Sequence, residues 1–304
     1  MPPAKKHHFV PQFLLRRFAD EHERLVVHRL AMDKSFIATV RNTGHRNFGH
    51  SIIMPGREPD HTSLEKYMSA IEGEAASAIT DLSGNRRKMV PNEHRDAIAW
   101  LLALQWQRSR FLFHSIRKET PEYDDTEVDQ TAFLASMLLM IESSVIFPWM
   151  ARNDEYARPK EQWNALVSVL LDPHMHWSCY RPHGLPLIAS DNIVCFSGAR
   201  DGFFPNIPKA YLDHGIGVGF WDFRRVTVPL GSNLGLIISR DSTDAVRMRA
   251  AEFNRYTVFN SREFVAHSPE WDARHPRLKG ELRENMRIQK WISPVFLREY
   301  SGQI

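Results

Sequence analysis

The sequence predicts an α+β protein, and three observations support this class. Apolar residues recur with helical spacing through most of residues 1–173, and short apolar runs separated by turn residues begin at residue 174. The composition, 43% hydrophobic and 25% charged, is that of a globular protein. We therefore expect one domain over residues 1–304: a helical bundle-like part (1–173), then a small and mostly antiparallel sheet followed by a C-terminal helix (174–304).

The first part is expected to hold a short N-terminal helix, a hairpin and four longer helices. The expected helices are 11–18, 62–84, 93–117, 129–147 and 161–171, and the hairpin strands are 25–30 and 35–40. In the first helix the apolar side chains of Phe13, Leu14 and Phe18 should dock it against the core. Thr62 and Glu65 match a capping box at the start of the second helix. Residues 42–59 are rich in turn formers and are expected to be a long loop.

The second part is expected to hold short strands and one helix. The expected strands are 176–181, 185–189, 193–197, 217–221, 225–229 and 234–239. Helix 244–256 follows, with Val246, Ala250 and Phe253 as its inner face. Residues 271–277 are polar and are expected to form a loop.

Cysteine usage and hydropathy point to a soluble chain in a reducing cytoplasm. Two cysteines exclude a disulfide framework and a four-cysteine zinc site. The longest apolar stretch, 131–150, contains Glu142 and Pro148, so a buried helix is expected there and no membrane partner. No apolar stretch follows the basic N-terminus, which argues against a secretory signal.

The net charge of +3 does not by itself indicate nucleic acid, but basic residues are unevenly distributed. Residues 1–50 carry nine Lys/Arg against four Asp/Glu, and residues 84–118 carry eight against two. Residues 119–129 then contain six acids and no base. Solvated surfaces and a polyanion-binding site both explain such blocks.

The N-terminal segment is the densest group of chemically useful residues. His7 and His8 precede the first helix, on which Gln12 and Arg16 lie one turn apart. If the helix docks, His7 and His8 are carried inward, where an imidazole can bind a metal or transfer a proton. Alternatively, one histidine packs against the core and the other is exposed.

Residues 7–18, HHFVPQFLLRRF, resemble the opening of a bacterial and fungal family of uncharacterised proteins. Its members begin with His-His-aromatic-Val/Ile-Pro-Gln, followed by Leu-Arg-x-Phe. Further landmarks resemble the family at 64–65, 71–72, 105–110, 190–192 and 228–232. In the family the triplet Ser-Asp-Asn is usually followed by Pro, whereas Ile193 follows it in this chain. The resemblance spans residues 5 to about 262 and implies a shared architecture, without an assigned activity.

Two of the expected helices carry polar residues that could form a binding site: helix 62–84 offers carboxylates, and helix 93–117 offers cationic and amide groups. Glu65 and Glu72 are seven residues apart, on one face of helix 62–84, and could hold a hard cation. On the next helix, Gln105 and Arg108 lie one turn apart, and Arg110 follows; a guanidinium there could bind a phosphate. A structural ion pair between Arg108 and one of the glutamates is the alternative.

Asp191 lies between two expected strands, where it is either a turn former or a metal or acid–base group. The His-His-x-x-Pro sequence is also similar to the first histidine of HNH nucleases. In this chain Asn42 and the next useful histidine, His45 or His50, are too far along the chain for that fold, and a helix is expected where it requires a strand. Phosphate loops, dinucleotide fingerprints, His-Glu-x-x-His and Gly-x-Ser-x-Gly are absent from the sequence.

These patterns lead to the hypothesis of a metal-dependent phosphodiesterase acting on nucleic acid, in a role such as bacterial defence. The expected catalytic residues are His8, Glu72 and Asp191; the ligands of Mg, Mn or Zn are His8, Glu65, Glu72 and Asp191; the substrate-binding residues are Gln12, Gln105, Arg108 and Arg110. One alternative is a non-catalytic sensor that recognises an anion through the Arg/Gln helix. A structural interaction protein is the other.

Overall fold

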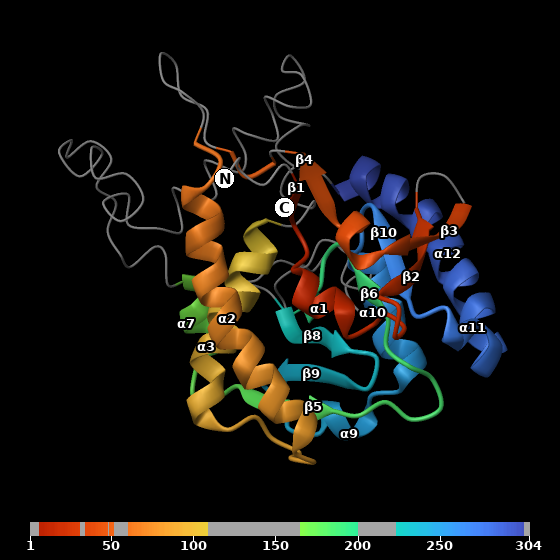
Figure 1. The fold of residues 1–304 in the computed structure, drawn as a ribbon. Coiled ribbons are helices and arrows are strands. Elements are labelled where there is room, and N and C mark those ends of the chain that lie inside the picture. Colours follow the sequence, from red (N-terminus) through yellow and green to blue (C-terminus); the bar gives the residue numbers. More distant parts are fainter. Residues whose placement is uncertain are drawn as a thin grey trace.

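In the described part of the chain, the computed structural model contains two four-stranded antiparallel sheets, a two-stranded ribbon and helices around them (Figure 1). It describes residues 6–30, 34–47, 49–51, 60–108, 165–199 and 223–300. Within these residues the α+β class is confirmed.

The central sheet has the order β5-β9-β8-β7. Its strands are β5 (His176–Tyr180), β9 (Leu234–Ser239), β8 (Phe223–Gly231) and β7 (Cys195–Ala199). All three pairings are antiparallel, and β8 and β9 form a hairpin with an irregularity between Pro229 and Gly231. Every residue of β9 is buried, so this strand lies in the middle of the core.

The second sheet has the order β3-β2-β10-β6 and joins both ends of the sequence. Its strands are β3 (Lys34–Thr39), β2 (Arg24–Arg29), β10 (Phe264–His267) and β6 (Ala189–Ser190). The expected hairpin is confirmed as β2 and β3, and β10 adds to the other edge of β2. A separate ribbon pairs β1 (Lys6–His8) with β4 (His45–Asn47), and the 3-10 turn η1 (Val40–Asn42) leads from β3 toward it.

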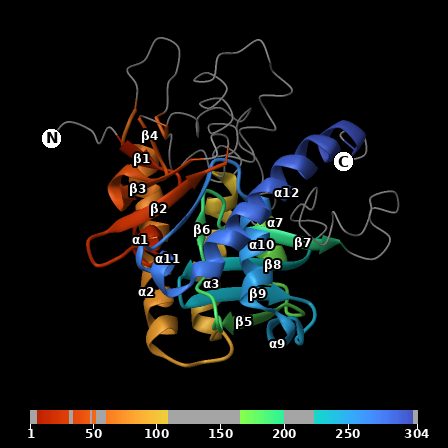
Figure 2. The ribbon, with the colours of Figure 1, turned by 90° about the vertical axis from the view of Figure 1, so that its right-hand side faces the viewer.

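Helices cover both faces of the central sheet (Figures 1 and 2). The helices are α1 (Gln12–Arg16), α2 (Ser63–Gly84), α3 (Asn92–Gln107), α7 (Ala165–Leu170), α9 (Asp244–Arg247), α10 (Ala250–Asn260), α11 (Glu270–Arg274) and α12 (Pro276–Tyr300). On one face, Trp106 of α3 meets Phe196 of β7, with ring centroids 6.3 Å apart. On the other face α10 approaches so closely that a Cβ at Gly235 would lie 2.7 Å from Phe253. Only glycine fits at this point of β9.

The N-terminal segment docks into the main core, as its apolar residues predicted. Phe9, Leu14, Leu15 and Phe18 are each at most 5% exposed. Next to them the Arg17 side chain donates to the carbonyl of Leu230 at 2.7 Å and also bonds the Ser83 hydroxyl. The segment therefore links β8 to α2 and is part of the core.

Three expectations were wrong in detail. Within residues 271–277 all but His275 are helical, as the end of α11 and the start of α12, and Leu278, Leu282 and Met286 of α12 bury one face in a small second core. Val246 is 86% exposed, since extended backbone at Met248 separates α9 from α10 and changes the helical phase. No side-chain capping bond forms at Thr62.

The order of elements is more mixed than a helical part followed by a sheet. Strands β1–β4 precede the long helices, and β2 pairs with a strand more than 230 residues later in the chain. The expected helix 129–147, strand 217–221 and residue Arg110 lie outside the described residues. Helices 93–117 and 161–171 are described in part, as α3 and α7.

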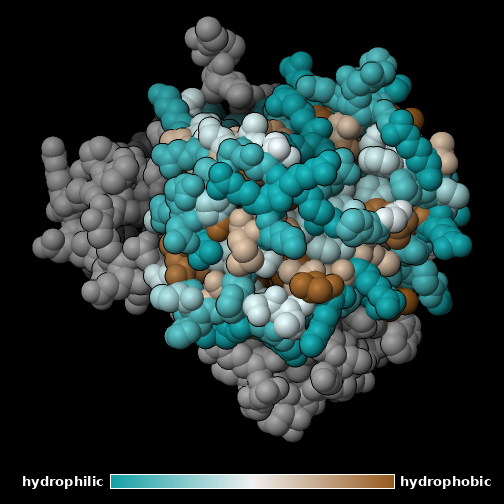
Figure 3. Space-filling view, turned by 90° about the horizontal axis from the view of Figure 1, so that it is seen from below, coloured by the Kyte–Doolittle hydropathy of each residue, from teal (hydrophilic) through white to brown (hydrophobic). Residues whose placement is uncertain are grey.

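On the face seen from below, hydrophobic residues are scattered among hydrophilic ones (Figure 3). Within the described residues, no helix combines the length and the apolar character needed to cross a bilayer. Single exposed apolar side chains, such as those scattered over the face in Figure 3, are ordinary on protein surfaces.

We expect Leu15→Ala to lower the free energy of unfolding by about 2–5 kcal/mol, because Leu15 is completely buried and the deletion leaves a cavity. Urea unfolding measures the change. Val246→Ala is the matched control, and its effect should stay within about 0.5 kcal/mol because the side chain is exposed. Equal effects of the two substitutions would contradict docking of the N-terminal segment.

Candidate functional site

Two histidines and one glutamate converge where the β1–β4 ribbon meets the first turn of α2. One ligand atom from each of His7, His50 and Glu65 lies within 4.8 Å of the other two. The His50 Nδ1 is 2.5 Å and the His7 Nδ1 4.0 Å from the same Glu65 oxygen. Both imidazoles are buried, and 35% of the Glu65 side chain is exposed. Among the described residues this is the group of three whose spacing suits a metal ion.

Strand geometry decides which N-terminal histidine enters this cluster. Successive side chains of a strand point to opposite faces, so His7 and His8 of β1 cannot both turn inward. His7 is the buried one, at 1% exposure. The ribbon is held by Gly44, whose φ of 64° and contact with Val10 favour glycine. The backbone N–H of His50 then donates to the His7 Nδ1 at 3.0 Å.

Burial and hydrogen bonding set the charge state of the cluster. Burial lowers the pKa of His50, although Glu65 opposes this shift. Burial would raise the pKa of Glu65, but the hydrogen bond and the charge of His50 lower it. At neutral pH a neutral His50 therefore donates to an ionised Glu65. A divalent cation could take the place of this shared proton, since metal ligands must be deprotonated.

His8 lies on the other side of the ribbon, and its hydrogen bonds fix its tautomer. Its Nε2 is 3.3 Å from the Arg41 carbonyl, which can only accept, and its Nδ1 is 3.3 Å from the Gln12 amide nitrogen. Arg16 in turn donates to the Gln12 oxygen at 3.2 Å, so the amide is oriented with its nitrogen toward His8. Burial, with a contribution from the neighbouring His45, lowers the pKa of His8 to about 4.

His45 stands opposite His8 in the ribbon, with their ring centroids 5.5 Å apart. Burial and the positive charge of Lys6 lower its pKa. Its Nδ1 is buried and has no hydrogen-bond partner within the described parts of the chain. A neutral imidazole nitrogen of this kind can accept or donate a hydrogen bond to a ligand.

Arg108 is a buried cation that is fully engaged inside the protein. It is 1% exposed and donates to Glu72 at 2.6 Å, which confirms the predicted ion pair. With the Gln105 amide in the orientation that its neighbours require, its oxygen accepts from Arg108 at 2.5 and 2.7 Å, and its nitrogen donates to the Phe9 carbonyl at 3.2 Å. The network thus joins α2 and α3 to the N-terminal segment.

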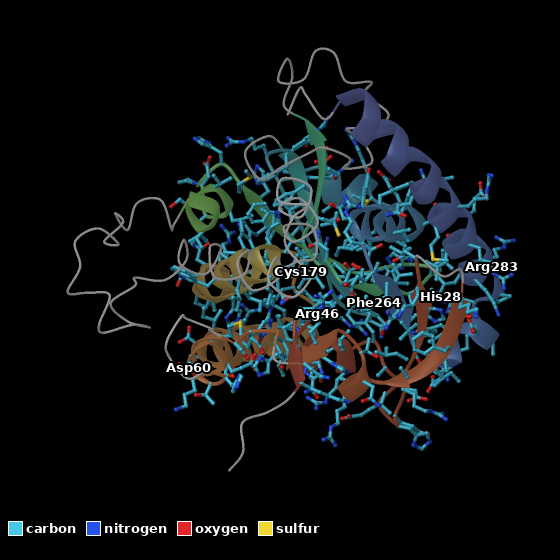
Figure 4. All side chains as sticks on the ribbon, turned by 90° about the horizontal axis from the view of Figure 1, so that it is seen from above. His28, Arg46, Asp60, Cys179, Phe264 and Arg283 are labelled. Carbon is cyan, nitrogen blue, oxygen red and sulfur yellow. The ribbon has the colours of Figure 1, made fainter. Side chains whose placement is uncertain are left out.

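Asp191 is completely enclosed and holds the turn before β10. Its carboxylate accepts from the backbone N–H of Arg262 at 3.0 Å and of Phe264 at 3.1 Å. Burial and the negative charge of Glu263 raise its pKa to about 6, against these hydrogen bonds. Glu263 also reaches Arg46 of β4 at 3.8 Å, and Figure 4 shows Arg46 beside Phe264. The turn that Asp191 holds is therefore connected to the β1–β4 ribbon through the ion pair of Glu263 with Arg46.

The expected metal set of His8, Glu65, Glu72 and Asp191 is not assembled in the described structure. Glu65 belongs to the cluster, but the other three have separate partners: Gln12 for His8, Arg108 for Glu72 and the turn at 262–264 for Asp191. His7 and His50 take their place. A strand at residues 6–8 directs only one histidine of the His-His pair inward, and this alternation is a signal that the sequence offers. His50 lies in a segment expected to be a loop, for which the sequence offers no such signal.

The chain belongs to the family described as "Protein of unknown function (DUF4238)", whose match covers residues 6–270. The expected membership of an uncharacterised family is thereby confirmed. No curated protein and no solved structure matches the chain significantly.

We expect Glu72→Ala to lower the free energy of unfolding by about 3 kcal/mol, because it leaves the buried Arg108 without its carboxylate. The effect should be at the lower end of the range for buried pairs, since 22% of the Glu72 side chain is solvated. Denaturant unfolding compares it with Glu74→Ala on the exposed side of α2. Equal stabilities of the two variants would show that the pair is not needed.

Asp191 should make stability fall as the pH rises. Its folded pKa of about 6 lies above the ordinary value of 3.8, so the protonated form stabilises the fold. This contribution is complete below about pH 4 and is lost by about pH 6. Relative to Asp191→Asn, the parent should lose stability between these pH values in urea unfolding. A stability difference between the parent and Asp191→Asn that does not change with pH would contradict the prediction.

Proposed function

We propose that the protein is a metal-dependent phosphodiesterase and that His7, His50 and Glu65 hold its divalent metal. The observation that carries the proposal is the close approach of two imidazoles and one carboxylate, all within 4.8 Å. Two His and one Glu are a donor set used by catalytic zinc, which keeps a further position for water. Imidazole and carboxylate donors also suit manganese.

The charge state of the cluster supports this use. The lowered pKa values of His50 and Glu65 keep the imidazole neutral and the carboxylate ionised at neutral pH, and a metal would replace the proton on the His50 Nδ1. A metal held by His7, His50 and Glu65 would supply water activation and would offset the negative charge of a phosphodiester. The exposed part of Glu65 gives the cluster contact with solvent.

The surroundings favour an anionic substrate. The ribbon carries Lys6 and Arg46, and Arg41 is exposed on the turn beside it. Phosphodiester chains bind such basic surfaces through their phosphates. Nucleic acid is therefore the proposed substrate class.

A sensor that reads anions through Gln105 and Arg108 has less support. Both side chains are buried, and their polar groups bond Glu72, Phe9 and each other. An anion would have to displace the Glu72 carboxylate from a buried guanidinium.

We expect cleavage of single- and double-stranded oligonucleotides by the parent with Mg²⁺, Mn²⁺ or Zn²⁺, and none with a chelator. His50→Ala and Glu65→Gln should each reduce the rate by more than about 100-fold, since loss of a supporting partner alone costs about 10–100-fold. Melting curves establish that both variants are folded.

His22→Ala is the matched control, because the His22 side chain is 64% exposed, and it should cleave like the parent. His8→Ala should still bind the metal, since His8 lies outside the cluster. Folded His50 and Glu65 variants that cleave normally would remove the cluster from the mechanism. A parent that neither binds metal nor cleaves would overturn the proposal.

A further inference from the structure

A second pair of histidines lies where the β3-β2-β10-β6 sheet meets α11 and α12. His28 of β2 and His267 of β10 are diagonal neighbours on one face, since His28 stands opposite Val265 and His267 opposite Val26. Their Nε2 atoms are 3.0 Å apart, and both side chains are buried. Figure 4 shows His28 at this junction, with Arg283 of α12 nearby.

The hydrogen bonds of His267 are those of a typical metal-binding histidine. Its Nδ1 is 2.9 Å from the Ser268 carbonyl, which can only accept, so the proton lies on Nδ1 and the Nε2 lone pair points to His28. Metal-bound histidines commonly donate their other ring N–H to a backbone carbonyl in this way.

A carboxylate oxygen near this pair lacks a partner. The Asp272 Oδ1 is buried, has no hydrogen-bond partner within the described parts of the chain, and lies 3.7 Å from the His267 Nε2. Leaving a buried acceptor unpaired is costly, and a cation bound between the three groups would remove that cost. One third of the Asp272 side chain is exposed. The three groups do not have the mutual 4.8 Å spacing of His7, His50 and Glu65, so binding a cation requires the Asp272 carboxylate to turn toward His28.

Both imidazoles are kept neutral. Burial lowers the pKa of His28 to about 4 and also lowers the pKa of His267, and the positive charge of Lys279 adds to both shifts. Arg283 acts on His28 in the same direction, whereas Asp272 opposes these shifts for both histidines. The cations of α12 weaken the site for a metal ion, and the carboxylate of Asp272 offsets them.

We propose that His28, His267 and Asp272 form a second metal site, for zinc or a similar borderline divalent cation, with water completing the coordination. Two imidazoles and a carboxylate suit such an ion, whose ligand distances are about 2.0–2.2 Å. The ion would connect α11 to the sheet at the edge of a small second core. This core is formed by Leu30, Ile188, Val258, Val265, Leu278, Leu282 and Met286. The site is independent of the His7–His50–Glu65 cluster, and its role is to hold the C-terminal helices.

Zinc content after dialysis and the visible spectrum of the Co²⁺-loaded protein test the proposal. His28→Gln should contain one zinc fewer than the parent, and zinc should raise its melting temperature less. Asp272→Ala changes an already partly exposed side chain and should weaken zinc binding by about 10-fold or more. It keeps the test valid if His28→Gln does not fold.

His50→Gln separates the two sites. It should lose the zinc of the His7–His50–Glu65 cluster and keep the zinc held by His28, His267 and Asp272, so failure of the proposed function leaves this test intact. His22→Gln is the exposed control and should match the parent in zinc content. Unchanged zinc content and an unchanged Co²⁺ spectrum in both His28→Gln and Asp272→Ala would overturn the second site.

Discussion

The burial of one positive charge, that of Arg108, constrains how the layers of this protein meet. A guanidinium removed from water must be compensated by a carboxylate and by hydrogen-bond acceptors, because leaving it unpaired costs several kcal/mol. Glu72 supplies the carboxylate from α2, and Gln105 supplies the amide oxygen from α3. The same amide donates to the Phe9 carbonyl, so the position of the N-terminal segment depends on the Arg108 charge.

The geometry of the histidine cluster follows from this constraint. Phe9 comes two residues after His7, so fixing its carbonyl fixes the end of β1. Glu65 lies two turns before Glu72 on the same helix, so pairing of Glu72 with Arg108 also sets the place of Glu65. Two parts of the chain that are far apart in sequence are thus held together rigidly, as ligands of a metal or substrate must be.

Other buried polar groups fix the junctions between strands, turns and helices. Asp191 uses its carboxylate to hold the turn before β10, and Glu263 in that turn extends the connection to Arg46 of the ribbon. His28 and His267 occupy the junction of the second sheet with α11 and α12. These groups lie where apolar packing alone would leave the relative orientation of layers poorly specified, and their directional bonds define it.

The sequence by itself determined much of the local structure and one buried ion pair. Periodicity predicted α2 and the β2–β3 hairpin, because spacing of apolar residues encodes which face is buried. Helix phase also predicted that Arg108 pairs with Glu65 or Glu72, and the structure shows the pair with Glu72. Helix phase did not reveal α12, whose strongly charged exposed face hides the apolar stripe of Leu278, Leu282 and Met286.

Only the tertiary structure decided which residues share a site. His50 approaches Glu65 from an irregular segment, and no period relates the two. Strand alternation sends His7 inward and His8 outward, but which of them faces α2 depends on the pairing of β1 with β4. His28 and His267 meet because β10 pairs with β2 across more than 230 residues. Such contacts are set by packing and strand register over the whole chain, so local sequence carries no signal for them.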